Sequence, residues 1–283
     1  MSNLKFAAGL GFKPEHYDAA KQCAVSGLWF EVHPENYMVE GGPRIKWLES
    51  IRERHPISLH GVSLSLAADS PPEAVHLARL KALADRVQPA LFSEHLAWST
   101  WRGQYQPDLL PFPRSREALT RICENIMRTQ DALARRIAIE NPSHYLRIEG
   151  HDWSELDFLG ELTRRSGCAL LLDVNNVFIS AHNLGFDAAA YLDAVPGDAV
   201  VEIHLAGHSA DLGGNSALLI DSHDASIADD VWALYRRVVD RIGARPTLIE
   251  RDDNIPEFNV LLAERARAQT ILESTRMRMR MPA

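Results

Sequence analysis

Residues of the types that bind metal ions stand at or just after short apolar segments of this chain. Three histidines and three carboxylates come at the ends of such segments: His60, His95, Glu140, Asp173, His204 and Glu250. A second set follows closely in the sequence: Asn176, His208, Asp221 and His223. Imidazole and carboxylate ligands without cysteine suit iron or manganese better than zinc. These residues therefore point to the chemistry of a bound transition metal.

The apolar segments alternate along the whole chain with segments that can form helices. The expected strands lie in 6–12, 28–36, 57–66, 90–98, 136–145, 169–177, 199–208 and 247–254. The expected helices are 14–26, 43–54, 71–87, 115–135, 154–166, 187–194, 226–242 and 256–273. Alternation of this kind is typical of parallel strands joined by right-handed helical crossovers. A length of 283 residues fits one such barrel, since these domains have about 250 residues.

We therefore predict an α/β fold of one domain, a (β/α)8 TIM barrel over residues 1–275, with 276–283 as a disordered tail. Ser115 is the expected N-cap of the longest helix, and Gly167 and Gly243 stand where helix C-caps belong. The competing architecture is a doubly wound open sheet. That fold usually carries a glycine-rich phosphate-binding turn after its first strand, and GLGFKP is a poor match to it.

Side chains of a strand alternate between its two faces, so parity indicates which polar groups point into a barrel. Ile137 and Ile139 share one face of their strand, and Ala138 and Glu140 share the other. The same reasoning directs five further side chains inward near the rim: His60, His95, Asp173, His204 and Glu250. Active sites of TIM barrels lie at the carboxyl ends of the strands, where these residues are expected.

Carboxylates that point into a barrel need partners, because burying an unpaired charge is very costly. Arginine and lysine are scarce at these strand ends, and Arg251 is the main candidate. Six ligands also exceed the three that a catalytic zinc ion usually takes, which favours more than one ion. A single strand-end histidine is more often structural, and a single rim carboxylate is more often a helix N-cap. Their coincidence at so many of the strand ends favours metal.

Two further acids lie near the expected site. Glu31 is either an additional ligand or the partner of an arginine. Glu202 shares inward parity with His204 one layer below it, so we expect it to support the site rather than to bind metal.

Composition and charge exclude several classes of function. The net charge of −8 argues against a nucleic-acid-binding surface, which needs a basic stripe. The three cysteines, Cys23, Cys123 and Cys168, are scattered, so we expect reduced thiols rather than disulfides. No signal peptide is apparent, and no apolar stretch approaches the ~18 residues of a membrane helix. We expect a cytoplasmic protein without membrane or nucleic-acid partners.

A set of motifs in the chain resembles a known enzyme family. The motifs are ENYM, SLHGVSLSL, SEHLAWS, IENPSHY, LLLDVNN, EIHLAGH, DSHD and LIERDDN. They are similar to those of the multinuclear non-heme iron-dependent oxidative enzymes, the MNIO family, which includes enzymes of methanobactin and bufferin biosynthesis. The resemblance runs from about residue 6 to residue 258. It departs at Ala67, where glycine is expected, and at Ser222, where threonine is usual.

The resemblance implies a TIM barrel that holds two or three iron ions in mixed Fe(II)/Fe(III) states. It implies three ligand sets, with Glu140 bridging the first two: His60, His95 and Glu140; Glu140, Asp173, His204 and Glu250; and Asn176, His208, Asp221 and His223. Relatives act with dioxygen on cysteine residues of ribosomally made precursor peptides. Many of them depend on a separate partner protein that delivers the leader of the peptide.

Two other classes of function stay open from the residues alone. The first is a divalent-metal sugar isomerase or endonuclease-like hydrolase on a related barrel, which would need a lysine or arginine at the rim. The second is a non-catalytic metal-binding module, which a full ligand set at an open barrel mouth disfavours.

Overall fold

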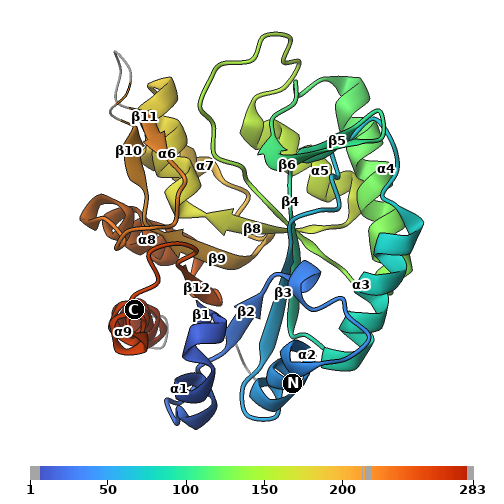
Figure 1. The fold of residues 1–283 in the computed structure, drawn as a ribbon. Helices are drawn as coiled ribbons and strands as arrows, with labels where there is room; N and C mark the ends of the chain where they lie inside the picture. The colour runs from blue at the N-terminus through green and yellow to red at the C-terminus, as the bar shows by residue number, and fades with distance from the viewer. Residues whose placement is uncertain (1–6, 212, 214–217, 279–283) are drawn as a thin grey trace.

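A closed barrel of eight parallel strands forms the centre of the molecule in the computed structural model, which describes residues 7–211, 213 and 218–278 (Figure 1). The strands are β1 (Ala8–Gly11), β2 (Phe30–Val32), β3 (Ile57–Gly61), β4 (Leu91–His95), β7 (Ala138–Glu140), β8 (Ala169–Asp173), β9 (Val200–Ala206) and β12 (Thr247–Glu250). They pair in this order around the barrel, and β12 closes it against β1. The predicted TIM barrel is confirmed.

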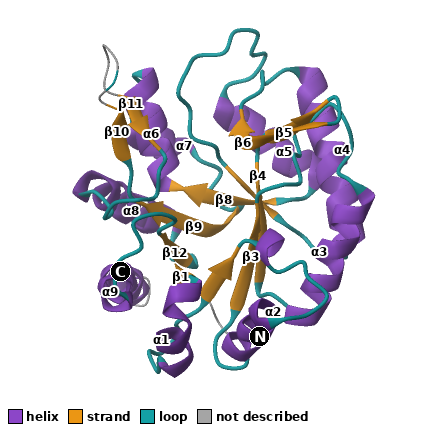
Figure 2. Ribbon diagram, viewed as in Figure 1, coloured by secondary structure: helices purple, strands orange, loops and turns teal. Residues whose placement is uncertain are grey.

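Helices surround the barrel and cover the outer faces of its strands (Figure 2). They are α1 (Tyr17–Gln22), α2 (Pro43–Arg52), α3 (Ala74–Val87), α4 (Arg116–Leu133), α5 (Glu155–Ser166), α6 (Val174–Leu184), α7 (Ala188–Ala194), α8 (Asp229–Ile242) and α9 (Phe258–Arg278), with short 3₁₀ turns at Pro14–His16 and Pro34–Asn36. In α8, Val231, Trp232, Tyr235, Val238 and Val239 are buried. This spacing places them on one helical face, and each large apolar side chain contributes about 1.5–3 kcal/mol when buried.

The predicted helix caps are present. The Ser115 side chain accepts a hydrogen bond from the backbone N–H of Ala118, as an N-cap should. Gly167 and Gly243 follow α5 and α8 with φ of 72° and 79°, which a residue without a Cβ adopts at little cost.

Most strands are shorter than the apolar segments expected to form them, and two boundaries differ in kind. The strand expected over 169–177 stops at Asp173, and α6 begins at the next residue. The run LLLDVNNVFI is apolar on both sides of this boundary, and periodicity alone does not separate a buried strand from a buried helix. At the other end of the chain, α9 continues to Arg278, into the expected tail. The remainder of that tail, 279–283, lies outside the described residues.

Two small antiparallel hairpins were not expected from the sequence. The strands β5 (Trp98–Trp101) and β6 (Gln104–Leu110) follow β4, and β10 (Ser209–Asp211) and β11 (Leu218–Ile220) follow β9. Both hairpins extend loops that leave the carboxyl end of the barrel (Figure 1). Within the described ranges, no helix has both the length and the apolar character that crossing a bilayer requires.

Candidate metal centre

Six barrel strands deliver the predicted side chains to one end of the barrel. His95, Glu140, Asp173 and Glu250 are the last residues of β4, β7, β8 and β12. Parallel pairing aligns His95 with Glu140 and aligns Asp173 with His204. All but His95 are buried, in keeping with the inward parity inferred from the sequence: His60, Glu140, Asp173, His204 and Glu250.

Three of these side chains form a tight triangle. His60 Nε2 and His95 Nε2 are 3.3 Å apart, and each lies 3.1 Å from Glu140 Oε2. The other ring nitrogens bind the protein: His60 Nδ1 contacts Ser93 Oγ at 2.8 Å, and His95 Nδ1 contacts the Gly61 carbonyl oxygen at 2.9 Å. Metal–ligand bonds of about 2.0–2.1 Å place neighbouring ligand atoms about 3 Å apart. The triangle therefore has the dimensions and the donor set of a two-histidine, one-carboxylate metal face.

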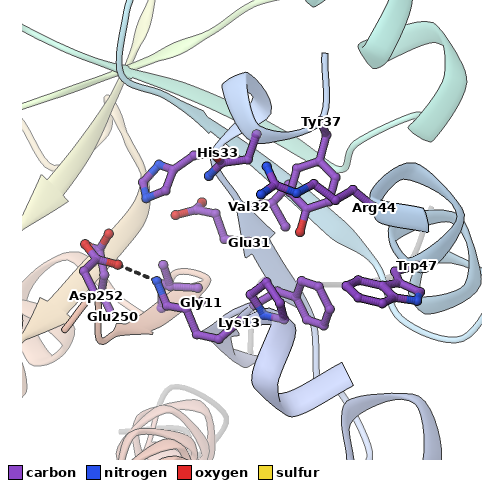
Figure 3. A pocket seen from close by; sticks show the side chains of 14 residues that line it. Gly11, Lys13, Glu31, Val32, His33, Tyr37, Arg44, Trp47, Glu250 and Asp252 are labelled. Carbon is purple, nitrogen blue, oxygen red and sulfur yellow. Dashed lines mark hydrogen bonds and ion pairs between the residues drawn. The ribbon is translucent and has the colours of Figure 1, made fainter. Parts of the chain in front are cut away.

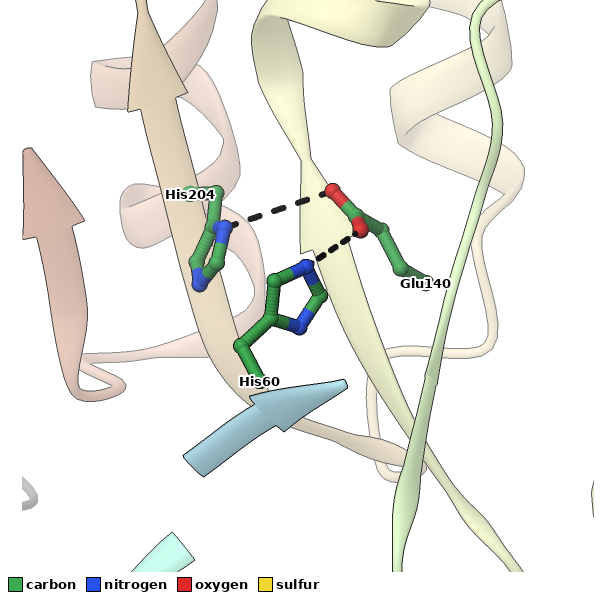
Figure 4. Close-up of side chains that lie close together, drawn as sticks. All are labelled: His60, Glu140 and His204. Atoms are coloured by element: carbon green, nitrogen blue, oxygen red, sulfur yellow. Dashed lines mark ion pairs between the residues drawn. The ribbon is translucent and has the colours of Figure 1, made fainter. Parts of the chain in front are cut away.

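Glu140 also faces a second group of ligand atoms. Figure 4 shows its carboxylate between the rings of His60 and His204, with one oxygen toward each. Glu140 Oε1 lies 4.0 Å from His204 Nδ1, which is 3.2 Å from Glu250 Oε2. Asp173 belongs to the same region, because it groups with His223 and Glu250 within 4.8 Å. The two oxygens of Glu140 are thus placed between two sets of donors.

Asp173 combines two roles that the sequence analysis treated as alternatives. Its Oδ1 accepts a hydrogen bond of 2.6 Å from the Asn176 N–H and so caps α6. Its Oδ2 is buried and has no hydrogen-bond partner. One carboxylate therefore anchors a helix and still offers a free oxygen to the centre.

The outer set is brought together only in part. His223 Nε2 lies 2.8 Å from Asp221 Oδ1, and Asn176 Oδ1 is buried without a hydrogen-bond partner. His208 is connected to them through Asn175, whose Oδ1 is 2.8 Å from His208 Nδ1 and whose amide donates to Asp221 at 3.0 Å. Of the compact groups of ligand atoms found among the described residues, none includes His208.

Burial and close packing of charges shift the pKa values of these groups strongly. Burial raises the pKa of Glu140, but His95 and His60 lower it to about 2. Burial lowers the pKa of His60, and Glu140 raises it to about 10. Burial raises the pKa of Asp173, and the charges of Glu140 and Asp221 raise it further. Carboxylates and imidazoles that lie this close are well satisfied by a cation between them.

Two nearby cations already form ion pairs outside the six ligands predicted at the strand ends. Arg251, the candidate partner named from the sequence, lies 3.4 Å from Glu264 on α9. Lys13 binds Asp252 at 2.6 Å. Buried ligand atoms without a hydrogen-bond partner remain on Glu140, Asp173, Asn176, His204 and His223. Orphaned atoms of these types fit resident metal ions, since buried polar atoms otherwise find partners.

A cavity of about 190 Å³ lies beside this centre and reaches Glu31 and Glu250. Figure 3 shows Glu31 and Glu250 on its lining, with the Lys13–Asp252 ion pair on one side and Arg44 and Trp47 on another. A small group can thus approach the carboxylates without a change of the barrel itself.

The sequence analysis missed two residues of the site. Asp252 Oδ2 lies 2.9 Å from His223 Nδ1, and its place two residues after Glu250 could have indicated it. Asn175 gave no such signal, because the start of α6 decides which of two adjacent asparagines faces His208.

Comparison with known proteins identifies the family. The profile described as RiPP precursor modification enzyme MbnB/TglH/ChrH matches residues 7–273. The chain belongs to this family. The resemblance seen in the motifs is thereby confirmed, and the family is one of enzymes that modify ribosomally synthesised, post-translationally modified peptides (RiPPs). A UPF0276 protein of Caulobacter sp. (strain K31) is 64% identical over 265 residues, which are 94% of this chain and 96% of that protein.

A more distant sequence relative and two solved structures are also similar to this chain. A UPF0276 protein of Paraburkholderia phytofirmans is 47% identical over 264 residues, covering 93% of this chain and 86% of that protein. Among solved structures, D-psicose 3-epimerase from Clostridium cellulolyticum H10 has a TM-score of 0.59 at 10% identity and covers 96% and 98% of the two chains. Endonuclease IV from Thermus thermophilus has a TM-score of 0.54 at 17% identity and covers 95% and 99%. At these identities the structural likeness concerns the barrel fold alone.

Proposed function

We propose that this protein is a multinuclear iron-dependent oxidase that consumes dioxygen and modifies cysteine residues of a ribosomally synthesised precursor peptide. The observation that carries the proposal is the triangle of His60, His95 and Glu140, whose carboxylate also turns toward His204. A face of two histidines and one carboxylate is typical of non-heme iron sites that use dioxygen. The peptide substrate follows from membership of the family.

The ligand sets that we propose are those that the motifs imply. His60, His95 and Glu140 hold one ion, and Glu140 shares its second oxygen with another. The second ion takes the following residues: Glu140, Asp173, His204 and Glu250. The outer ion takes Asn176, His208, Asp221 and His223, with Asn175 orienting His208. Bound iron supplies one-electron redox chemistry with dioxygen, which redox-silent zinc does not.

The protein contributes position and exclusion of water. The side chains of His60 and Glu140 are 1% and 3% exposed, whereas that of His95 is 17% exposed. His95 is thus the most accessible side chain of the triangle, and a cysteine side chain of the peptide would approach the centre on its side. Holding that side chain beside the centre replaces a chance encounter by a fixed geometry, which lowers a barrier by several kcal/mol.

The direct test is co-expression with a Cys-containing precursor peptide and a leader-binding protein, both sought among the genes that neighbour this one. Each two-electron oxidation removes two hydrogens from the peptide. Loss of two hydrogens reduces one dioxygen to hydrogen peroxide, and loss of four reduces it to two waters. We expect the peptide to lose two or four hydrogens, confined to its cysteine-containing fragments in tandem mass spectra. An unchanged peptide from cells that contain the iron-loaded protein and the partner would contradict the proposal.

The runner-up is a divalent-metal enzyme that acts on a sugar or a phosphate ester. It requires a cation near the metal, and Lys13 and Arg44 do line the cavity beside Glu31 and Glu250. Metal analysis of protein purified without oxygen separates the two functions. Two or three iron ions per chain support the oxidase, and zinc or manganese in their place supports the runner-up.

The outer ion should be the first to leave the protein. Its ligands Asp221 and His223 come from a loop and are 15% and 16% exposed, whereas the Glu140 and His204 side chains are 3% and 0% exposed. We expect a mild chelator to remove one ion while the His60–His95 ion stays bound, as followed by metal content and Mössbauer spectra of ⁵⁷Fe-loaded protein. Earlier loss of the His60–His95 ion would show that this order is wrong.

A further inference from the structure

His204 has a different orientation from the other histidines of the centre. In the other four, Nδ1 contacts an oxygen of the protein: His60, His95, His208 and His223. In His204 it is Nδ1 that faces the centre, 3.2 Å from Glu250 Oε2 and 4.0 Å from Glu140 Oε1. Its Nε2 points the opposite way, where it meets Glu31 Oε1 at 3.3 Å.

Glu31 is well placed to act on this ring. It lies on β2, across the barrel from β9, and it is 4% exposed, while His204 is fully buried. Among the residues that the structure describes, Glu31 forms its ion pair with His204 and not with an arginine, so the arginine partner considered from the sequence is not found. A buried carboxylate beside one ring nitrogen favours the proton on that nitrogen.

We propose that Glu31 is a positioning residue that accepts the Nε2 proton of His204 and so presents the Nδ1 lone pair to the metal. The inference rests on the proposed metal centre and adds to it a residue outside its ligand sets. Histidine ligands commonly donate their second N–H to a carboxylate, which fixes the tautomer and the ring orientation and raises the basicity of the ligand. Loss of such a partner typically weakens metal binding by about 10- to 100-fold.

Glu202 provides a matched comparison. It lies in the same buried layer, but its Oε1 is 3.9 Å from His204 Nε2, farther than the 3.3 Å of Glu31 Oε1. One possible ligand atom from each of Glu31, Glu202 and His204 lies within 4.8 Å of the other two. The rival explanation is therefore that these three residues bind a separate cation. The two explanations differ in what Glu202 contributes: a cation site needs its charge, and the positioning role does not.

The experiment measures metal affinity in Glu31→Gln, Glu31→Ala and Glu202→Gln proteins, each loaded anaerobically with Fe(II) and titrated with a competing chelator. We expect Glu31→Ala to weaken the ion held by His204 by about 10- to 100-fold. Glu31→Gln, which keeps an acceptor oxygen without the charge, should lie between Glu31→Ala and wild type. The His60–His95 ion should bind as in wild type in every variant, which also reports that the barrel is folded.

Other outcomes would overturn the inference. Wild-type affinity of the His204 ion in Glu31→Ala would show that Glu31 does not position the ring. Loss of one bound equivalent in Glu202→Gln, with the other ions retained, would show that Glu31, Glu202 and His204 hold their own cation. A wild-type protein that binds no Fe(II) would contradict the metal centre itself, a result distinct from either of these.

Discussion

Glu140→Ala protein should lose more than one metal ion, whereas His60→Ala protein should lose chiefly one. The carboxylate of Glu140 is 3.1 Å from the nitrogens of His60 and His95 through Oε2, and Oε1 faces His204. In the proposed ligand sets Glu140 serves two ions, while His60 serves one. The expected consequence for the reaction is loss of detectable peptide oxidation in Glu140→Ala.

Metal analysis of the two variants beside wild type makes the comparison, with circular dichroism to show that the barrel is retained. Neither change alters the large apolar core outside the strands, so we expect both variants to fold. Full metal content in Glu140→Ala would refute the bridging role. Loss of one and the same number of ions in both variants would also refute it.

Gly207→Ala should damage the outer set of ligands and leave the inner ones intact. A Cβ at Gly207 would lie 1.9 Å from the Ala225 carbonyl oxygen and 2.4 Å from the Ala225 carbonyl carbon. Backbone at that distance has to move, and the moving loop carries Asp221 and His223. Because overpacking of this kind costs about 1–3 kcal/mol, we expect a lower free energy of unfolding together with loss of the outer ion.

Gly160→Ala is the matched control, because a Cβ at Gly160 in α5 meets nothing within 4 Å. Alanine in place of glycine inside a helix should raise the free energy of unfolding by about 0.5–1 kcal/mol. Urea unfolding and metal analysis of both variants check the pair. A Gly207→Ala protein with unchanged stability and three bound ions would show that the close backbone contact does not hold the loop.

The barrel could be predicted because the local sequence indicates its eight strands and most of its helices. Apolar runs alternate with amphipathic segments, and caps such as Ser115 and Gly167 mark helix ends. The helix α6 could not be predicted, because its sequence continues the apolar run of β8. A buried helix and a buried strand have the same apolar character in the sequence. The local sequence also does not indicate the hairpin formed by β5 and β6. The strand β6 is largely exposed and contains Pro107, a residue that disfavours strands.

The candidate site could be predicted as far as parity and strand ends allow. Alternation placed Glu140 and His204 inside the barrel, and both are buried there. Parity does not determine which nitrogen of a ring faces the centre, so the orientation of His204 toward Glu31 needed the structure. The contact of Asp252 with His223 joins the loop after β12 to the loop after β9, and only the closed barrel brings these loops together.

The most direct test of the proposed function uses purified protein in a single turnover. Protein loaded with iron without oxygen, and a matched sample loaded with zinc, are mixed with the precursor peptide and the partner protein, with and without dioxygen. We predict loss of two or four hydrogens from cysteine-containing fragments only where both iron and dioxygen are present, as measured by peptide mass. An unchanged peptide in that sample, or the same change in the zinc-loaded one, would contradict the account.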